Sequence, residues 1–197
     1  MARRSDHNRE ELAALILEAA RRIVAEEGLR GLAARKLAER VGYAPGTLYN
    51  VFANMDEVIL RLNAASLSSL RDALAAIPKE GSPREHLMRL SFAYLDFVRQ
   101  KGSSWSAVFE HRLPEGEIVP DWYDARIEAL LSLAEEALAP YFSPADAESR
   151  REAAVALWAA LHGLGNLATA DKLSTVTGKS PERILVRLVG SFLDGLK

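Results

Sequence analysis

The stretch APGTLYNVF, residues 44–52, gathers small and hydrogen-bonding side chains on one side of a potential helix. At about 3.6 residues per turn, Gly46, Tyr49 and Asn50 fall on the outward side, with Thr47 on the flank. A purely structural helix usually carries charges there, whereas this side is neutral. Such a face suits contact with phosphate oxygens and base edges of nucleic acid.

The 4 histidines offer no recognisable catalytic pattern. They are His7, His86, His111 and His162, and in the sequence none forms an HExxH pair or follows a glycine-rich phosphate loop. His111 lies close to Trp105 and Phe109, so it could line a pocket, although a buried histidine is more often a satisfied core residue. An enzyme is therefore a rival hypothesis, which turnover of a bound ligand would favour.

Two short helices, expected at 34–41 and 45–52, would position the hydrogen-bonding face. Gly42 lies at the break, where glycine allows a positive φ, and the small Ala38 allows a second helix to cross closely. Pro45 suits a first helical position. The expected buried positions are Leu37, Val41, Tyr43, Leu48 and Val51. The pattern predicts a helix-turn-helix that enters the DNA major groove, and the alternative is an ordinary helical hairpin.

The remaining periodicity is helical, and no period of two indicates strands. We expect a helix over 8–27 that ends at Gly28, and a helix over 55–77 capped by Asn54. Further helices are expected over 84–101, 105–113 and 121–138, from a cap at Ser143 to 170, and from Ser180 to 193. The sequence thus predicts an all-α fold of about nine helices. A three-helix DNA-binding domain would occupy 1–62 and a larger helical domain 63–197.

Composition indicates a globular chain and gives little help with the partner. The 197 residues are 49% hydrophobic and 26% charged, with a net charge of −2. The absence of cysteine excludes disulfides and thiolate metal sites and fits a reducing cytoplasm, and no cofactor is expected. The first residues lack the apolar core of a secretory signal. Arg3, Arg4 and Arg9 lie in a terminal arm that either is solvated or contacts DNA.

The stretch 153–170 contains no charged residue. It is too rich in Ala, Gly and polar groups for a membrane span, so we expect no membrane partner. A helix without charge on any side must be covered on all sides. We therefore predict a homodimer interface formed by Ala156, Ala160, Gly163, Leu185, Leu188 and Phe192. The alternative is a central helix buried within one chain.

Aromatic side chains are concentrated between residues 84 and 130. Pockets for small molecules are mostly apolar with a few orienting polar groups. We predict an apolar ligand, anchored by a hydrogen bond from His111 or Tyr94. The expected ligand-binding residues are Phe92, Tyr94, Trp105, Phe109, His111, Trp122, Trp158 and His162. The alternative is that these side chains only fill the core.

Residues 10–62 resemble the N-terminal domain of the TetR family of bacterial transcriptional regulators. Trp158 and His162-Gly163 resemble the Trp-His-Gly signature of one TetR-like C-terminal domain class. The resemblance implies a homodimer on a palindromic DNA operator, usually a repressor, released by a small-molecule inducer. It also implies DNA contacts from Arg35, Pro45, Gly46, Thr47, Tyr49 and Asn50. A helix-turn-helix scaffold protein without ligand control is the alternative.

Two positions depart from the family pattern in ways that affect helix stability. The family usually has Ser or Thr before each helix of the pair, where this chain has Ala33 and Ala44. Each replacement removes a side-chain cap worth about 1 kcal/mol. Phosphate contacts made by other family residues that this chain replaces, at Val51 and Met55, do not carry over.

Overall fold

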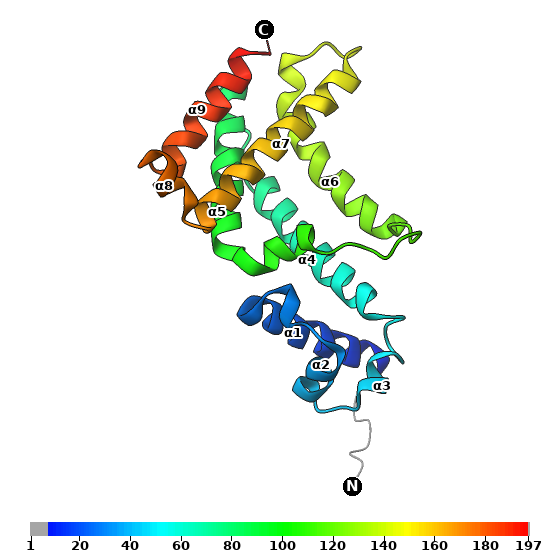
Figure 1. The fold of residues 1–197 in the computed structure, drawn as a ribbon. Coiled ribbons are helices and arrows are strands. Elements are labelled where there is room, and N and C mark those ends of the chain that lie inside the picture. The colour runs from blue at the N-terminus through cyan, green and yellow to red at the C-terminus, as the bar shows by residue number, and fades with distance from the viewer. Residues whose placement is uncertain (1–7, 197) are drawn as a thin grey trace. The chain divides into compact units, whose positions relative to one another are not determined.

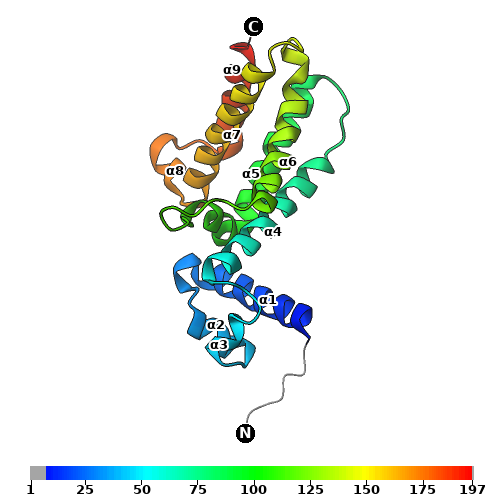
Figure 2. The same cartoon turned by 90° about the vertical axis from the view of Figure 1, so that its right-hand side faces the viewer.

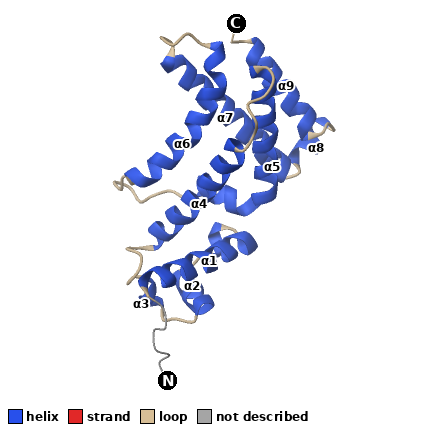
Figure 3. Cartoon of the chain, turned by 180° about the vertical axis from the view of Figure 1, so that it is seen from behind, coloured by secondary structure: helices blue, strands red, loops and turns tan. Residues whose placement is uncertain are grey.

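The computed structural model describes residues 8–196, and every regular element among them is a helix (Figures 1 and 3). The expected all-α fold of about nine helices is confirmed for this part of the chain. Its α-helices are α1 (Arg9–Glu27), α2 (Ala34–Val41), α3 (Pro45–Leu48), α4 (Met55–Ala75), α5 (Pro83–Glu110), α6 (Asp121–Leu138), α7 (Ala147–Thr169), α8 (Lys172–Thr177) and α9 (Pro181–Asp194). Short 3-10 turns occur at Leu29–Gly31 and Ala139–Tyr141. Arg3, Arg4 and His7 lie outside the described residues.

The described residues divide by packing into two compact units. The first unit comprises the residues up to Ser66 together with Gly102–Tyr123, and the second comprises Leu67–Lys101 and the residues from Asp124 onward. Helices α4 and α5 therefore each contribute residues to both units. The expected domain boundary near Leu62 stays a prediction.

Helix α1 begins and ends at residues suited to those positions. The Asn8 side chain accepts a hydrogen bond from the Glu11 N–H, and the Glu11 carboxylate accepts one from the Asn8 N–H, each at 2.9 Å. This reciprocal pair is a capping box, which fixes the first turn. Gly28 ends the helix at a φ of 73°, which glycine adopts without strain. The buried stripe consists of Leu12, Ile16, Ala19, Ala20, Ile23 and Val24.

Helix α3 is shorter than the expected 45–52, because regular α-helix ends at Leu48. The N–H groups of Tyr49, Asn50 and Val51 each bond to the carbonyl three residues earlier. This tighter 3-10 pattern commonly completes the last turn of a helix. The outward side that α-helical periodicity predicts for residues 45–52 is therefore formed partly by α3 and partly by this 3-10 turn.

Helix α5 contains the break expected at Gly102, whose φ of 40° and ψ of −114° are not helical. The part after the break ends at Glu110 rather than at 113, and a loop leads to α6. The break bends the chain between Lys101 and Gly102, where the two packing units also divide. Because glycine can adopt this conformation, α5 continues across the break and contributes residues to both units.

In the second unit, α7 and α9 lie side by side, as Figures 1 and 2 show from two directions. Ser180 caps α9 as expected, since its Oγ accepts a hydrogen bond from the Arg183 N–H at 3.3 Å. The expected cap at Ser143 was wrong, because α7 begins at Ala147. Ser143 instead closes a turn, in which its carbonyl accepts the Asp146 N–H at 2.9 Å.

None of the helices within residues 8–196 combines the length and apolar character needed to cross a membrane. The uncharged stretch 153–170 lies almost entirely within α7.

Candidate nucleic-acid interface and ligand-binding residues

The helix pair α2–α3 packs on α1 through a small core. Leu37 and Ala38 are fully buried, and the close crossing expected at Ala38 stays a prediction. Gly42 adopts the left-handed conformation, with φ 81° and ψ 26°, and its N–H bonds to the Ala38 carbonyl at 2.9 Å. Leu48 joins the same core from α3. The geometry is that of a helix-turn-helix, held by burial on both sides of the turn.

The residues expected to contact DNA lie on the surface of this pair. Tyr49 is 50% exposed although it is a large aromatic residue, and Gly46 and Asn50 are also exposed. The Arg35 side chain is 88% exposed and lies 3.4 Å from Glu39 on the same helix. Pro45 is exposed and Thr47 is half-buried. The sequence from residue 41 to residue 53, which includes α3, contains no charged residue.

Helix α2 is tied to the last turn of α1 by charged side chains. The Lys36 ammonium pairs with the Glu27 carboxylate, and the Arg40 guanidinium pairs with Glu26 at 3.2 Å. These pairs are partly exposed, so each contributes little stability by itself. The side of α2 that is covered is set by the buried Leu37 and Ala38, and Arg35 lies on the exposed side.

The expected ligand-binding residues fall into two groups, one in each packing unit. In the first unit, Trp105 is 1% exposed and meets Phe109 edge to face, with ring centroids 5.3 Å apart. The Arg61 guanidinium lies 4.3 Å from the centroid of the Trp122 ring, a cation–π contact. The contact between Arg61 and Trp122 joins the segment 102–123 to α4.

Polar groups of the first unit are buried beside these aromatic rings. Asn63 is 1% exposed, and its Nδ2 donates to the Ala107 carbonyl at 3.3 Å. Burial raises the pKa of Tyr123, against a smaller lowering by a hydrogen bond with Asn63. The His111 side chain is 9% exposed, and its Nε2 lies 3.4 Å from Asp56 Oδ1. The predicted anchor His111 therefore faces α4.

In the second unit, Tyr94, Trp158 and His162 form a network between α5 and α7. The Tyr94 hydroxyl lies 3.1 Å from His162 Nδ1, and Asn166 Nδ2 lies 2.9 Å from His162 Nε2. The Trp158 ring stacks on the imidazole at 6.0 Å. Burial lowers the pKa of His162, which favours the neutral ring. The half-buried Phe92 belongs to the same unit.

The expected dimer residues differ in their exposure. Ala156 and Gly163 are exposed on α7, while Ala160, Leu188 and Phe192 are half-buried. Leu185 is a correction, because it is fully buried within its own chain and offers no surface to a partner. The exposed side of α7 also includes Val155 at 40% and Leu167 at 44% exposure. Exposed apolar residues and glycine thus occur between residues 155 and 167 of this helix.

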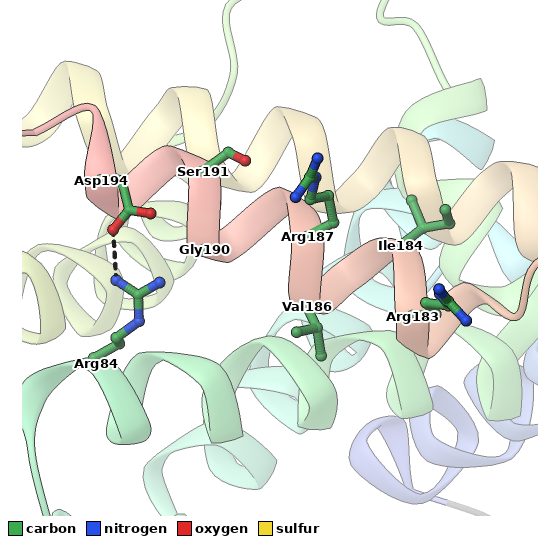
Figure 4. Close-up of a pocket in the computed structure, with 8 residues that line it drawn as sticks. All are labelled: Arg84, Arg183, Ile184, Val186, Arg187, Gly190, Ser191 and Asp194. Atoms are coloured by element: carbon green, nitrogen blue, oxygen red, sulfur yellow. Dashed lines mark hydrogen bonds and ion pairs between the residues drawn. The ribbon is translucent and has the colours of Figure 1, made fainter.

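A groove of about 600 Å³ lies along α9 and reaches the first turn of α5 (Figure 4). Arg84 spans the groove and pairs with Asp194 at 2.8 Å. Arg183 and Arg187 also line it, beside the apolar Ile184 and Val186. None of the residues expected to bind a ligand lines this groove.

Comparison with protein families identifies both parts of the chain. Residues 16–62 match the model described as bacterial regulatory proteins, tetR family. Residues 87–192, more than half of the chain, match the tetracyclin repressor-like C-terminal domain. The chain belongs to the TetR family. It is a TetR-family transcriptional regulator with a helix-turn-helix DNA-binding domain.

One curated relative and several solved structures are similar to this TetR-family chain. The HTH-type transcriptional regulator YobS of Bacillus subtilis is 26% identical over 118 residues, which are 59% of this chain and 62% of YobS. A protein of unknown function from Rhodococcus sp. RHA1 has the same fold, with a TM-score of 0.77, 19% identity and 98% of each chain covered. The regulator FadR from Bacillus subtilis, solved with stearoyl-CoA, has a TM-score of 0.59 and 17% identity, with 93% of this chain and 96% of FadR covered.

The structure confirms the two missing caps that set this chain apart from the usual TetR pattern. Ala33 and Ala44 occupy the N-cap positions of α2 and α3 in extended conformations, without a side-chain hydrogen bond to the helix. One contact was missed from the sequence. The guanidinium of Arg9 donates to the Val51 carbonyl at 3.3 Å. A signal existed, because Arg9 lies three residues before Leu12 and seven before Ile16, in helical register with two core residues, although Arg9 itself is exposed.

Proposed function

We propose that this TetR-family regulator binds, as a homodimer, a palindromic operator and releases it when a small apolar molecule binds. The observation that carries the DNA-binding part is the exposed, charge-free face of Gly46, Tyr49 and Asn50 on a helix pair with a well-buried core. Each subunit of the dimer would place this face in one of two successive major grooves.

The proposed roles follow from side-chain chemistry. Through its side-chain amide, Asn50 can form hydrogen bonds with the major-groove edge of adenine, which gives sequence selectivity. Tyr49 and Arg35 reach phosphates, because they are exposed and carry a hydroxyl and a guanidinium. Pro45, Gly46 and Thr47 allow the backbone to approach the groove closely, since their side chains are small or compact.

The proposed dimer rests on the exposed side of α7. Val155, Ala156, Gly163 and Leu167 are all exposed, although they are apolar or lack a side chain. Burying such a face against a second copy removes apolar surface from water and allows close helix approach. Leu188 and Phe192 on α9 would extend the contact from their half-buried positions.

The proposed ligand is apolar, and its coupling to DNA runs through helices shared by both units. Stearoyl-CoA bound to the FadR neighbour is one example of a ligand with a long apolar chain. Segment 102–123 contacts α4 through Trp122 on Arg61 and His111 beside Asp56. Because α4 follows the DNA-reading residues directly, a ligand that shifts this segment would alter the helix-turn-helix.

The DNA-binding proposal is tested by selecting tight sites from randomised duplexes with the full-length protein. Recovery of a palindrome is the expected result. Tyr49→Ala should then weaken binding to all sequences, whereas Asn50→Ala should lose preference at one base pair, by about 1–3 kcal/mol. Gln100→Ala is the matched control, because Gln100 is an exposed amide far along the sequence in α5.

Distinct results would contradict separate parts of the proposal. Selection without enrichment would favour the scaffold protein. Unchanged selectivity in the Asn50 variant would contradict the assignment of the segment 45–52 as the reading element. For the ligand part, calorimetry with stearoyl-CoA as the first probe is repeated with and without operator. A coupling of about 1–3 kcal/mol is expected, and it must be reciprocal. Binding with equal affinity in both states would end the allosteric proposal, and turnover of the probe would favour an enzyme.

A further inference from the structure

The DNA-reading segment 45–52 has little helical structure to hold it in place. Regular α-helix covers only Pro45–Leu48, a single turn. Tyr49 and Asn50, which are proposed to touch DNA, lie after that turn in the 3-10 continuation. Carbonyl groups at such a helix end need partners from outside the helix. The orientation of these two side chains therefore depends on contacts made by other elements.

Arg9 supplies one such contact from the first residue of α1. Its Nη2 donates to the carbonyl oxygen of Val51 at 3.3 Å, across 42 positions in the sequence. A cation at the C-terminal end of a helical segment is favoured by the helix dipole. The bond is charge-assisted, and the planar guanidinium gives it a defined direction.

The backbone that carries Arg9 is itself fixed. Asn8 and Glu11 form the capping box of α1, so the first turn is ordered at the point where the Arg9 side chain leaves it. Leu12 and Ile16, further along the same face, pack in one core with Leu48. Helix α1 thus offers a rigid base for the bond to Val51.

The exit of the segment is fixed from the other side by α4. Glu57 accepts a hydrogen bond from the Ala53 N–H at 2.8 Å, and its own N–H donates to the Asn54 side chain at 2.8 Å. The pKa of Glu57 lies below its ordinary value, mainly because of the Ala53 bond. Desolvation opposes this shift, and Arg61 and the charge of Arg9 add to it. Arg9 and Glu57 therefore hold consecutive peptide groups at the end of the segment.

We propose that Arg9 is a positioning residue for operator recognition, which holds Tyr49 and Asn50 in their reading orientation through the Val51 carbonyl. This inference rests on the proposed DNA binding of α3. It differs from a phosphate contact, the role that an arginine in a terminal arm would otherwise have. Arg35 provides the comparison, because its side chain is 88% exposed and its ion pair lies within its own helix.

The test compares Arg9→Gln with Arg35→Gln in the full-length protein. Affinities for the selected operator and for a random duplex are measured over a range of salt concentrations. Arg9→Gln should weaken operator binding about tenfold, with random-duplex affinity and salt slope unchanged. Arg35→Gln should weaken binding to both duplexes and reduce the slope of log K against log salt by about 1.

Hydrogen exchange of the peptide covering 45–53 is measured on both variants without DNA. Arg9→Gln should speed exchange there, while Arg35→Gln should leave it at the wild-type rate. Hydrogen exchange can be measured even if the wild-type protein selects no DNA sequence. In that case the proposed function fails, and the contact between Arg9 and Val51 is still tested. Equal weakening on both duplexes with a reduced slope in Arg9→Gln would make Arg9 a phosphate contact. Unchanged operator binding or unchanged exchange would also overturn the inference.

Discussion

The Nε2 atom of His111 lies 3.4 Å from the Oδ1 atom of Asp56. His111 follows the last residue of α5, and Asp56 lies in the first turn of α4. The His111 side chain is 9% exposed, so this contact is largely shielded from water. A residue proposed from sequence to hold a ligand thus also touches the helix that follows the DNA-reading segment.

This contact predicts a measurable coupling between the two side chains. His111→Ala, Asp56→Ala and the double variant form a double-mutant cycle, followed by urea unfolding near neutral pH. We expect a coupling energy of about 1 kcal/mol, because contacting residues in a shielded site do not behave additively. Strictly additive losses would mean that the two groups are neighbours without an interaction.

The missing helix caps predict a simple gain in stability. Ala44 is exposed and extended, with φ −70° and ψ 147°, which a capping serine adopts without strain. Ala44→Ser should raise the free energy of unfolding by about 1 kcal/mol. The control Ala65→Ser, at an exposed position inside α4, should lower the free energy of unfolding by about 0.5 kcal/mol. Equal effects of the two changes would argue against capping.

Two glycines of α7 separate dimer formation from folding. A Cβ built on Gly163 meets nothing within 4 Å in the single chain, whereas one on Gly165 meets Val98 Cγ1 at 3.0 Å. Gly163→Leu should therefore keep its helical circular dichroism but sediment as a monomer, because only a partner helix is obstructed. Gly165→Leu should destabilise the fold itself by about 1–3 kcal/mol, through overpacking against Val98.

The outcome for Gly163 decides between two interpretations of α7. A wild-type protein that sediments as a monomer at micromolar concentration would contradict the proposed dimer. Unfolding of Gly163→Leu would favour a central helix covered within one chain. Phe192→Asp offers an independent change, because it places a charge on the half-buried side of α9.

The His162 network predicts a loss of stability on acidification. Burial lowers the pKa of His162 below its ordinary value of 6.5, so the unfolded chain takes up the proton first as pH falls. The stabilising contribution is complete above pH 6.5 and declines as pH falls toward the folded-state pKa. Urea unfolding between pH 7 and pH 5 should show a steeper decline for the wild type than for His162→Gln. Parallel curves would contradict the prediction, since the other histidines contribute equally to both proteins.

Much of the fold followed from local sequence. The limits of α2 and α6 agree with expectation, and the break at Gly102 was visible because few residues other than glycine adopt its conformation. The helix-turn-helix was also predictable, since burial of Leu37 and Leu48 follows from helical spacing. These features depend on interactions within about one or two turns of chain, where residue type and spacing are sufficient information.

Contacts between distant parts of the chain were decided by the tertiary structure. Sequence placed the aromatic residues of 84–130 in one candidate group, yet the structure assigns them to two packing units that divide at Gly102. It also buries Leu185 in its own chain and brings Arg9 to Val51 across 42 positions. Helical periodicity tells which side of a helix is apolar. Which neighbour covers that side depends on the combined packing of all the helices, and so it is settled only when the whole chain has folded.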